Sequence, residues 1–248
     1  MNEQDRLVQE GLFVSKRLFQ LQEKPIKGKY DLSHLCKINE YLFQDLPKLG
    51  GDYAKIYKPG QYRPALLPWK MWMKHRPLLN CSDVSTIVYS NMDEAIIKET
   101  NAYLLKNTSI TKLKRMRINN FVNKISELYT KLDYLHPFYD GNSRTIREFT
   151  RTLALEAGFN MNWQNTNINI QSRNELYIAR DTAVNQIAYE RCTIPEGKYD
   201  IEMYMKPFKG KKTLTEILSD NVERIKVKKR KLTLDVKPTT DRSRDRSR

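Results

Sequence analysis

The chain has 248 residues, which is long enough for one folded domain with an appendage. Its hydrophobic content is 40%, and no run approaches the roughly eighteen apolar residues of a membrane-spanning helix, so no membrane span is predicted. The formal net charge of +15 first suggests nucleic acid as a partner, but residues 206–248 carry fifteen Lys and Arg against six acidic residues. Those residues hold +9 of the charge, and the mildly basic remainder does not predict a nucleic-acid-binding domain.

Two helices are predicted at the N-terminal end. Residues 3–23 carry leucines at helical spacing among polar neighbours, and a proline and a glycine follow. The second helix runs from Tyr30 to Leu46, with Asp31 as its N-cap. Its apolar stripe consists of Leu32, Leu35, Ile38, Leu42 and Phe43.

A small β-hairpin is predicted between residues 49 and 67, which are rich in glycine and proline. Two short β-rich runs, residues 53–57 and 61–63, flank the turn-forming pair Pro59-Gly60. A lone hairpin in a helical protein has an unpaired strand edge, which binds another chain by strand addition or serves only as a connector. The residues alone leave both interpretations open.

Helices are predicted for most of the chain beyond this hairpin. A helix capped by Ser82 or Asp83 runs to about residue 105, and others span about residues 112–135 and 172–192. The inward face of the helix over 112–135 consists of Ile118, Phe121, Val122, Ile125, Leu128, Tyr129 and Leu132. The pattern shows neither strand–helix alternation nor an internal repeat.

The stretch from Leu135 to Arg147 has the chemistry of a phosphate-binding turn that opens a helix. Asp140-Gly141-Asn142 contains the residue types that most easily adopt positive φ, which predicts a tight turn. Apolar residues then recur at helical spacing up to Gly158, which stands at the C′ position. The start of a helix directs several unpaired backbone N–H groups and the positive end of the helix dipole to one spot, which makes an anion site.

Charged side chains surround this turn. Arg144 and Arg147 lie three residues apart on one face of the helix, and guanidinium groups match phosphate oxygens. Asp140 at the lip could hold Mg²⁺, and His136 could accept a proton. Taken singly, these residues fit a capped helix start with two surface arginines and a loop histidine. Their joint order and spacing favour phosphate chemistry.

The segment from His136 to Arg147 resembles the signature of Fic-domain proteins, His-x-Phe-x-(Asp/Glu)-Gly-Asn-Gly-Arg-x-x-Arg, with Ser143 in place of the second glycine. Residues 30–45 also resemble the Fic segment that precedes the target-docking flap. The resemblance covers roughly residues 25–192 and implies an all-α Fic fold, a helical bundle with a small β-hairpin flap. The expected division is an N-terminal helix over 1–24, the Fic domain over 25–205, and a short helix with a basic, disordered tail over 206–248.

This resemblance implies a protein adenylyltransferase that moves AMP from ATP, with Mg²⁺, to a Ser, Thr or Tyr hydroxyl of a target protein. His136 would be the general base, Asp140 would hold the metal ion, and Phe138 would anchor the loop in the core. The nucleotide would be bound by Gly141, Asn142, Ser143, Arg144 and Arg147. The alternatives are phosphate or other nucleotidyl transfer on the same scaffold, and a non-enzymatic basic protein that binds nucleic acid.

The resemblance also implies a flap that clamps a segment of the target protein as an added strand. It falls on the predicted hairpin, and its residues would be Lys55, Ile56, Tyr57, Gln61 and Tyr62.

Two parts of the chain depart from the family pattern. If the position of Ser143 needs positive φ, its side chain costs on the order of 1 kcal/mol. The family's inhibitory helix, (Ser/Thr)-x-x-x-Glu-(Gly/Asn), is matched by Ser219 to Glu223 except at its last position, within a short helix predicted over 213–225. Glu223 would then lie against Arg147. The alternative is a solvated helix, with inhibition by a separate antitoxin-like chain.

The expected location is a reducing cytoplasm. Three cysteines and three histidines are scattered without a disulfide or metal pattern. Residues 1–6 are charged and lack the apolar core of a secretory signal peptide. The Arg-rich end, residues 241–248, resembles export signals of bacterial type IV secretion substrates, which would make the protein a host-directed effector; the alternative is a solubilising tail.

Overall fold

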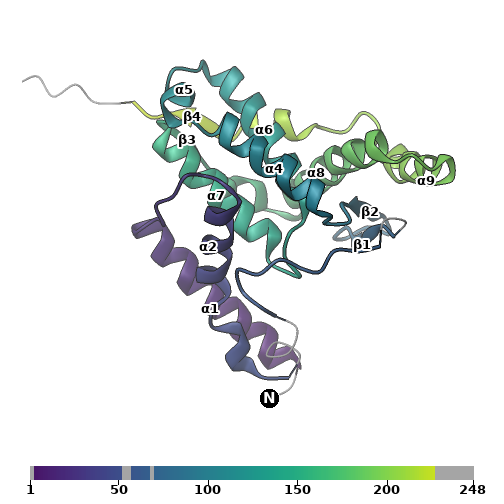
Figure 1. The fold of residues 1–248 in the computed structure, drawn as a ribbon, viewed down its shortest axis with the longest axis horizontal. Helices are drawn as coiled ribbons and strands as arrows, with labels where there is room; N and C mark the ends of the chain where they lie inside the picture. The colour runs from purple at the N-terminus through teal and green to yellow at the C-terminus, as the bar shows by residue number, and fades with distance from the viewer. Residues whose placement is uncertain (1–2, 52–56, 68–69, 227–248) are drawn as a thin grey trace, which may run out of the picture.

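The structure is a computed structural model that describes residues 3–51, 57–67 and 70–226. The described residues form a bundle of helices with two small antiparallel sheets (Figure 1), which confirms the predicted helical bundle with a small hairpin. The α-helices are α1 (Glu3–Glu23), α2 (Leu32–Phe43), α4 (Glu94–Asn107), α5 (Ile110–Lys114), α6 (Ile118–Leu135), α7 (Asn142–Glu156), α8 (Ile170–Arg191), α9 (Pro195–Met205) and α10 (Leu214–Ser219). The strands are β1 (Trp72–Pro77), β2 (Val84–Tyr89), β3 (Phe159–Met161) and β4 (Val222–Arg224), and short 3-10 turns span Leu46–Leu49, Trp163–Asn167 and Lys206–Phe208.

Both predicted N-terminal helices form, but the second, predicted from Tyr30 to Leu46, spans only Leu32–Phe43. The Asp31 side chain caps α2 by accepting a hydrogen bond from the His34 N–H at 2.8 Å. Val14 and Leu21 bury one face of α1 in the same core as the apolar stripe of α2. Between these two residues, the Arg17 guanidinium pairs with Asp45 at 2.7 Å. The C-terminal half of α1 is thus packed on the bundle.

Helices α6 and α7 carry the centre of the bundle. α6 contacts α4, α7, α8 and α10, and α7 lies between α6 and α2 (Figure 1). The prediction that Ile118 faces inward on α6 is wrong, because this residue is 37% exposed. The other positions of the predicted inward face are buried. The single helix predicted from residue 112 is two helices, because the chain breaks at residues 115–117. α7 ends before Gly158, whose φ of 81° fits the predicted C′ glycine.

The β-hairpin lies later in the chain than predicted. Within 57–67 the described residues contain no strand, and residues 52–56 lie outside the described part. β1 and β2 pair instead, with a register from Trp72 opposite Tyr89 to Pro77 opposite Val84. The helix predicted to start at Ser82 or Asp83 is wrong at that end: α4 starts after Asp93, which caps it through the Ile96 N–H at 2.8 Å.

α8 holds the hairpin through polar side chains along one face. The Asn185 amide pairs with β2 like a strand, accepting from the Val88 N–H at 2.9 Å and donating to the Thr86 carbonyl at 2.8 Å. The Asn174 amide does the same at the hairpin turn, where both of its hydrogen bonds go to the backbone of Leu79. One edge of β2 is therefore satisfied by α8, and the hairpin has a fixed position on the bundle.

The C-terminal described segment closes on β3. The helix predicted over 213–225 is shorter: α10 ends at Ser219, and the chain then forms β4, which pairs with β3. The last backbone contact joins the Ile225 N–H to the Gly158 carbonyl at 3.0 Å. The basic tail from residue 227 onward lies outside the described residues. Among the helices that are described, none has the length and apolar character to span a bilayer.

Candidate active site

The candidate site is built on the loop between α6 and α7. Directly after α6, His136 has a left-handed backbone, with φ 46° and ψ 59°, while its N–H still bonds the last turn of α6 at 3.1 Å. The Asn142 side chain binds the backbone of Phe138 twice, accepting from its N–H at 2.9 Å and donating to its carbonyl at 2.7 Å. Gly141, with φ 76°, turns the chain into α7. His136 and the start of α7 consequently line one cavity.

Two contacts seat this loop on the hydrophobic core. The ring of Phe138 is buried in the main core cluster. Gly141 lies against the ring of Phe43 in α2, and a Cβ at position 141 would stand 2.2 Å from its Cζ. The positive φ and this close approach both require glycine. The turn therefore depends on α2 as well as on its own residues.

The first turn of α7 directs free backbone N–H groups toward the loop. The Thr145 N–H bonds the Gly141 carbonyl at 2.9 Å, so the amides of residues 142–144 precede the first helical hydrogen bond. Ser143 has a helical backbone, because the left-handed residue of the turn is Gly141. The positive-φ cost considered for Ser143 does not arise, and the helix start has the geometry of an anion site.

The two arginines of the turn have different surroundings. Arg144 Nη2 lies 3.0 Å from Glu10 Oε1 of α1 and 3.5 Å from Asp140 Oδ2. Arg147 lies deeper: its Nε donates to the Ser143 carbonyl at 3.3 Å, and burial lowers the pKa of its guanidinium below the ordinary value. Arg144 lines the cavity at the turn, whereas Arg147 does not.

The cavity at the turn is small, about 70 Å³, and is lined by Lys74, Arg76, His136, Asp140, Gly141, Asn142, Ser143, Arg144 and Arg180. Ligand pockets are usually about 300–1,000 Å³. The cavity is therefore smaller than a typical ligand pocket, and side chains of β1 and α8 form part of its lining.

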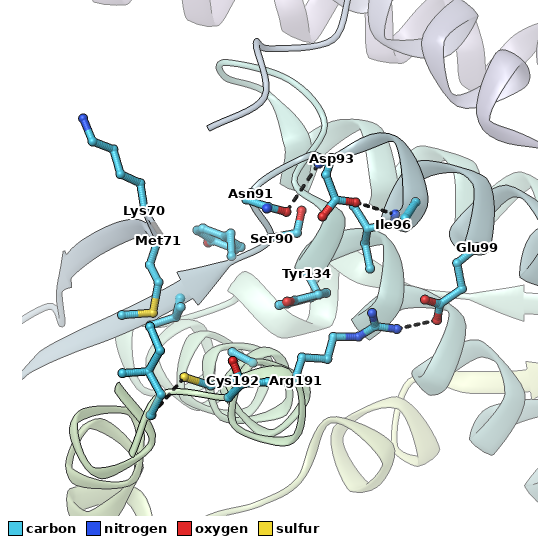
Figure 2. Close-up of a pocket in the computed structure, with 16 residues that line it drawn as sticks. Lys70, Met71, Ser90, Asn91, Asp93, Ile96, Glu99, Tyr134, Arg191 and Cys192 are labelled. Atoms are coloured by element: carbon cyan, nitrogen blue, oxygen red, sulfur yellow. Dashed lines mark hydrogen bonds and ion pairs between the residues drawn. The ribbon is translucent and has the colours of Figure 1, made fainter. Parts of the chain in front are cut away.

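A second cavity of about 310 Å³ lies at the other side of β2 (Figure 2). It is bounded by the start of α4 and the end of α8, and the ion pair of Glu99 with Arg191 crosses one side. Its lining includes neither His136 nor any residue of the turn. It is therefore separate from the candidate anion site.

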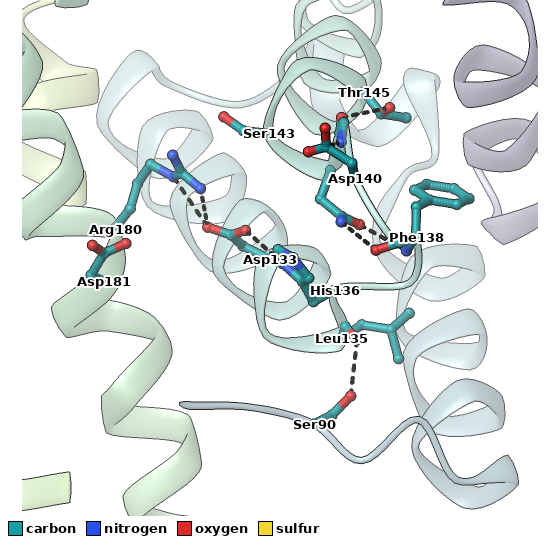
Figure 3. Close-up of polar contacts among 12 residues, drawn as sticks. Ser90, Asp133, Leu135, His136, Phe138, Asp140, Ser143, Thr145, Arg180 and Asp181 are labelled. Atoms are coloured by element: carbon teal, nitrogen blue, oxygen red, sulfur yellow. Dashed lines mark hydrogen bonds and ion pairs between the residues drawn. The ribbon is translucent and has the colours of Figure 1, made fainter. Parts of the chain in front are cut away.

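His136 is buried among one aromatic ring and several charged side chains. The residue is 6% exposed, and its ring stacks on Tyr89, with ring centroids 3.8 Å apart. Its Nδ1 lies 3.8 Å from Oδ1 of Asp133, one turn earlier in α6 (Figure 3). Burial lowers the pKa of His136 below its ordinary value, although Asp133 acts in the opposite direction. The imidazole is therefore neutral at pH 7 and can accept a proton.

Arg63 belongs to this site and was not predicted from the sequence. It is 2% exposed, and it donates to the carbonyls of His136 at 2.8 Å and Ser90 at 2.6 Å. Its own N–H bonds the Pro137 carbonyl at 2.8 Å, and its guanidinium lies 4.5 Å from the ring centroid of Trp72. Burial lowers the pKa of Arg63 to about 10. Arg63 thus ties the loop to both strands of the hairpin, which no local pattern around an arginine reveals.

The described part of the predicted flap, residues 57–62, contains no strand. Lys55 and Ile56 lie outside the described residues. Tyr57, Gln61 and Tyr62 belong to a loop without strands, and the Tyr62 ring lies 6.3 Å from that of Phe138. The strand that does line the cavity is β1, through Lys74 and Arg76.

The structure does not bring Ser219 and Glu223 to Arg147. Ser219 ends α10 and bonds the carbonyl of its own preceding turn at 2.9 Å. Glu223 lies in β4, where its Oε1 accepts from Asn160 at 2.9 Å. The carboxylate from outside the turn that contacts Arg144 comes from Glu10 in α1. No periodicity in the sequence indicated this contact.

Asp140 is placed at the lip of the cavity. Its Oδ1 accepts from the Gly141 N–H at 2.7 Å, and its carboxylate is about half exposed. Protein Mg²⁺ sites commonly use one or two carboxylates together with substrate phosphates and water. The described residues contain no group of three or more His, Cys, Asp and Glu side chains that could hold a metal. A single carboxylate beside an anion site fits Mg²⁺ that arrives with a phosphate ligand.

Comparison with known proteins identifies one family. The family model described as Fic/DOC family matches residues 29–154, half of the chain. The protein adenylyltransferase VbhT of Bartonella schoenbuchensis is 29% identical over 154 residues, and a protein adenylyltransferase of Bartonella henselae is 24% identical over 153 residues. These matches cover 62% and 60% of the chain, but only 27% and 26% of the relatives. The matched region thus spans about a quarter of the length of these curated relatives.

Solved structures share the fold. The N-terminal Fic domain of a VirB-translocated Bep effector from Bartonella quintana, with bound ADP, superposes with a TM-score of 0.58 at 17% identity, covering 91% of this chain and 88% of the other. BepC from Bartonella tribocorum, with bound AMPPNP, gives 0.56 at 14% identity, covering 91% and 90%. At these identities the likeness establishes the helical fold.

Proposed function

The chain belongs to the Fic/DOC family, and from this premise we propose that it is a protein adenylyltransferase that transfers AMP from ATP to a hydroxyl of a target protein. Curated relatives with this activity in their names support the reaction class. The observation that carries the proposal is the juxtaposition of a neutral, buried His136 with an open helix start and Arg144 in one cavity. Proton acceptor and anion site are the two elements that nucleotidyl transfer needs.

In the proposed reaction His136 takes the proton of the target hydroxyl. The hydroxyl oxygen then forms a bond to the α-phosphorus of ATP, and the bond from that phosphorus to the β-phosphate oxygen breaks to release pyrophosphate. Gly141, Asn142 and the amide of Ser143 hold the α-phosphate, while Arg144, with help from Arg147, binds the distal phosphates. The catalytic contribution is mainly positioning and charge stabilisation.

Mg²⁺ is proposed as a component of the nucleotide complex. Asp140, exposed beside the anion site, would hold it. The ion would neutralise phosphate charge during transfer. The other residues of the turn bind phosphate oxygens directly.

The hairpin β1–β2 is proposed as the place where the target segment docks. Lys74 and Arg76 of β1 line the cavity, and β2 is paired with β1 on one side and held by Asn185 on the other. β1 therefore has the free strand edge of this sheet among the described residues. A target segment added to β1 would approach His136.

Two further points belong to the proposal. Any inhibitor of the antitoxin type would be a separate chain, because Glu223 does not approach the site. The protein would act in a cytoplasm, and export into a host through its Arg-rich end is a hypothesis that effector names among the fold neighbours support. A translocation reporter fused with and without residues 238–248 tests the export hypothesis.

Labelled ATP tests the proposed reaction. Incubation of the protein with a lysate and α-³²P-ATP should label protein, whereas γ-³²P-ATP should not. His136→Ala should abolish the labelling, because the base is lost while the anion site remains. Label from γ-³²P-ATP would instead identify a phosphotransferase, and undiminished labelling by His136→Ala would refute the base assignment.

A further inference from the structure

Asp133 is a buried carboxylate behind His136 that the proposed reaction does not use. It lies one turn before His136 on α6 and is 1% exposed. Its Oδ2 accepts two hydrogen bonds from Arg180 of α8, at 3.1 Å from Nε and 2.7 Å from Nη2 (Figure 3). These bonds engage only Oδ2 and leave Oδ1 facing His136.

The two atoms that face each other lack other partners. Asp133 Oδ1 and His136 Nδ1 are 3.8 Å apart, and both are buried without a hydrogen bond in the described part of the chain. A buried polar atom left unpaired costs about 1–3 kcal/mol. A displacement of about 1 Å brings the two atoms to hydrogen-bond distance and removes both penalties.

Asp133 can only accept in that hydrogen bond. Burial alone would raise the pKa of Asp133, but Arg180 and His136 outweigh burial and hold it well below its usual range. The carboxylate is therefore ionised at neutral pH and has no proton to donate. The hydrogen between the two groups must be carried by Nδ1 of the imidazole.

The position of the His136 ring is also constrained. Tyr89 covers one face of the ring, and Arg63 holds the His136 carbonyl at 2.8 Å. We propose that Asp133 is a positioning residue that keeps the imidazole hydrogen on Nδ1 and leaves Nε2 as the proton acceptor at the cavity. This inference rests on the proposed function, in which His136 is the base.

Cations dominate the charges around His136. The titratable and charged groups near its ring come from several segments of the chain. They are Arg63 in the loop before the hairpin, Lys74 and Arg76 of β1, Tyr89 of β2, Asp133 of α6, Asp140 in the turn, Arg144 of α7 and Arg180 of α8. The cations disfavour the protonated imidazole, and Asp133 opposes them. Asp133→Asn should therefore lower the apparent pKa of His136 by about one unit or more.

Nitrogen-15 NMR of the full chain, labelled at histidine, reports the tautomer and the pKa of His136 without ATP or a target. His136→Ala assigns its signals among those of the three histidines. In the wild type we expect the hydrogen on Nδ1 at neutral pH. In Asp133→Asn we expect a mixture of tautomers together with the lowered pKa, since the anionic acceptor is lost.

Asp181→Asn is the matched control. Asp181 is equally buried and pairs with Arg76 at 2.5 and 2.7 Å, but it makes no contact with His136 among the described residues. Its replacement leaves Arg76 unpaired near His136, so the pKa can shift, but the hydrogen should stay on Nδ1 because Asp133 remains. If Asp133→Asn does not fold, the double variant Asp133→Asn/Arg180→Met removes both charges of the pair and should give the same mixture of tautomers. Hydrogen on Nε2 in the wild type, or the same mixture of tautomers in the Asp133 and Asp181 variants, would overturn the proposal.

Transfer of label provides a second measurement. Asp133→Asn should lower kcat about tenfold or more and leave KM for ATP unchanged, because the base is misoriented while the phosphate contacts remain. A wild type that transfers no label contradicts the proposed function and leaves the NMR result intact. An active wild type with the hydrogen on Nε2 contradicts only the role of Asp133.

Discussion

At the scale of single residues, the backbone of His136 decides where its imidazole lies. Positive φ is uncommon for a residue with a side chain because the Cβ atom crowds the neighbouring carbonyl. Here the conformation is held from outside the helix by Arg63, which bonds the His136 carbonyl, and by the stacked ring of Tyr89. The imidazole consequently lies at the end of α6, opposite the start of α7, and not on the side of the helix.

The buried position of His136 predicts the pH dependence of catalysis. The ordinary pKa of 6.5 is lowered by burial, and only the neutral imidazole can act as base. As the pH falls through this lowered pKa the ring becomes protonated, so kcat/KM should fall on the acid side with a midpoint below pH 6.5. Initial rates of label transfer between pH 5 and 8, at a target concentration far below KM, measure it. A midpoint above pH 6.5 would mean that another group causes the fall on the acid side.

Substitutions at Gly141 and Ser143 should have unequal effects on stability. Gly141→Ala places a Cβ at positive φ and 2.2 Å from the Phe43 ring, so the free energy of unfolding should fall by about 2 kcal/mol or more. Ser143 is helical, so Ser143→Gly relieves no strain and should cost about 0.5–1 kcal/mol. Urea unfolding of both variants tests this. A gain in stability for Ser143→Gly would show strain at that residue.

The sequence predicts the turn residues well because their chemistry is local. The order His, Asp, Gly, Asn, Arg indicates a turn, a base and an anion site without knowledge of the fold. Arg63, Asp133 and Arg180 could not be predicted, because charged residues are usually exposed and nothing in their neighbours indicates burial. Their burial arises from pairing across segments that are far apart in the chain.

At the scale of elements, α1 acts on the site from outside the family-matched region, which begins at residue 29. Its Glu10 carboxylate neutralises Arg144, which the proposed function assigns to the distal phosphates. Half-buried ion pairs of this kind contribute about 0.2–1 kcal/mol. Glu10→Gln should therefore tighten the binding of an ATP analogue by about two- to fivefold.

Isothermal titration calorimetry measures this change. Glu23→Gln is the matched control, since Glu23 is an exposed residue at the end of the same helix and loses the same charge. Its affinity should equal that of the wild type. An unchanged affinity in Glu10→Gln would mean that Arg144 does not contact the phosphates.

The hairpin shows why elements are harder to predict than motifs. Pro59-Gly60 is a strong turn signal, yet Arg63 in the following segment bonds the site and no strand forms over 57–67. The true strand β2 is buried on both faces, so Val84 to Tyr89 lacks the alternation typical of a strand and its apolar residues also fit a helix. Its partners in the fold, β1 along its length and Asn185 of α8 at its other edge, identify the segment as a strand.

At the scale of the whole molecule, much of the net positive charge lies at the C-terminal end, beyond the last backbone contact of the fold. Residues 226–248 contain ten Lys and Arg against three Asp, so they carry +7 of the net +15. The last backbone contact of the described chain is made by Ile225, just before this segment. Deleting residues 226–248 should leave the melting temperature and the transfer of label unchanged.

The same deletion should weaken any binding to nucleic acid. If the full chain binds duplex DNA, the binding is electrostatic and falls steeply with salt, because it depends on release of counterions. Removal of ten cationic side chains should weaken it at least tenfold at low salt. Deleting only residues 238–248 removes four Arg and two Asp, and should weaken it much less. Salt-dependent binding retained by residues 1–225 would instead place a nucleic-acid surface on the folded domain, and a non-enzymatic function would regain support.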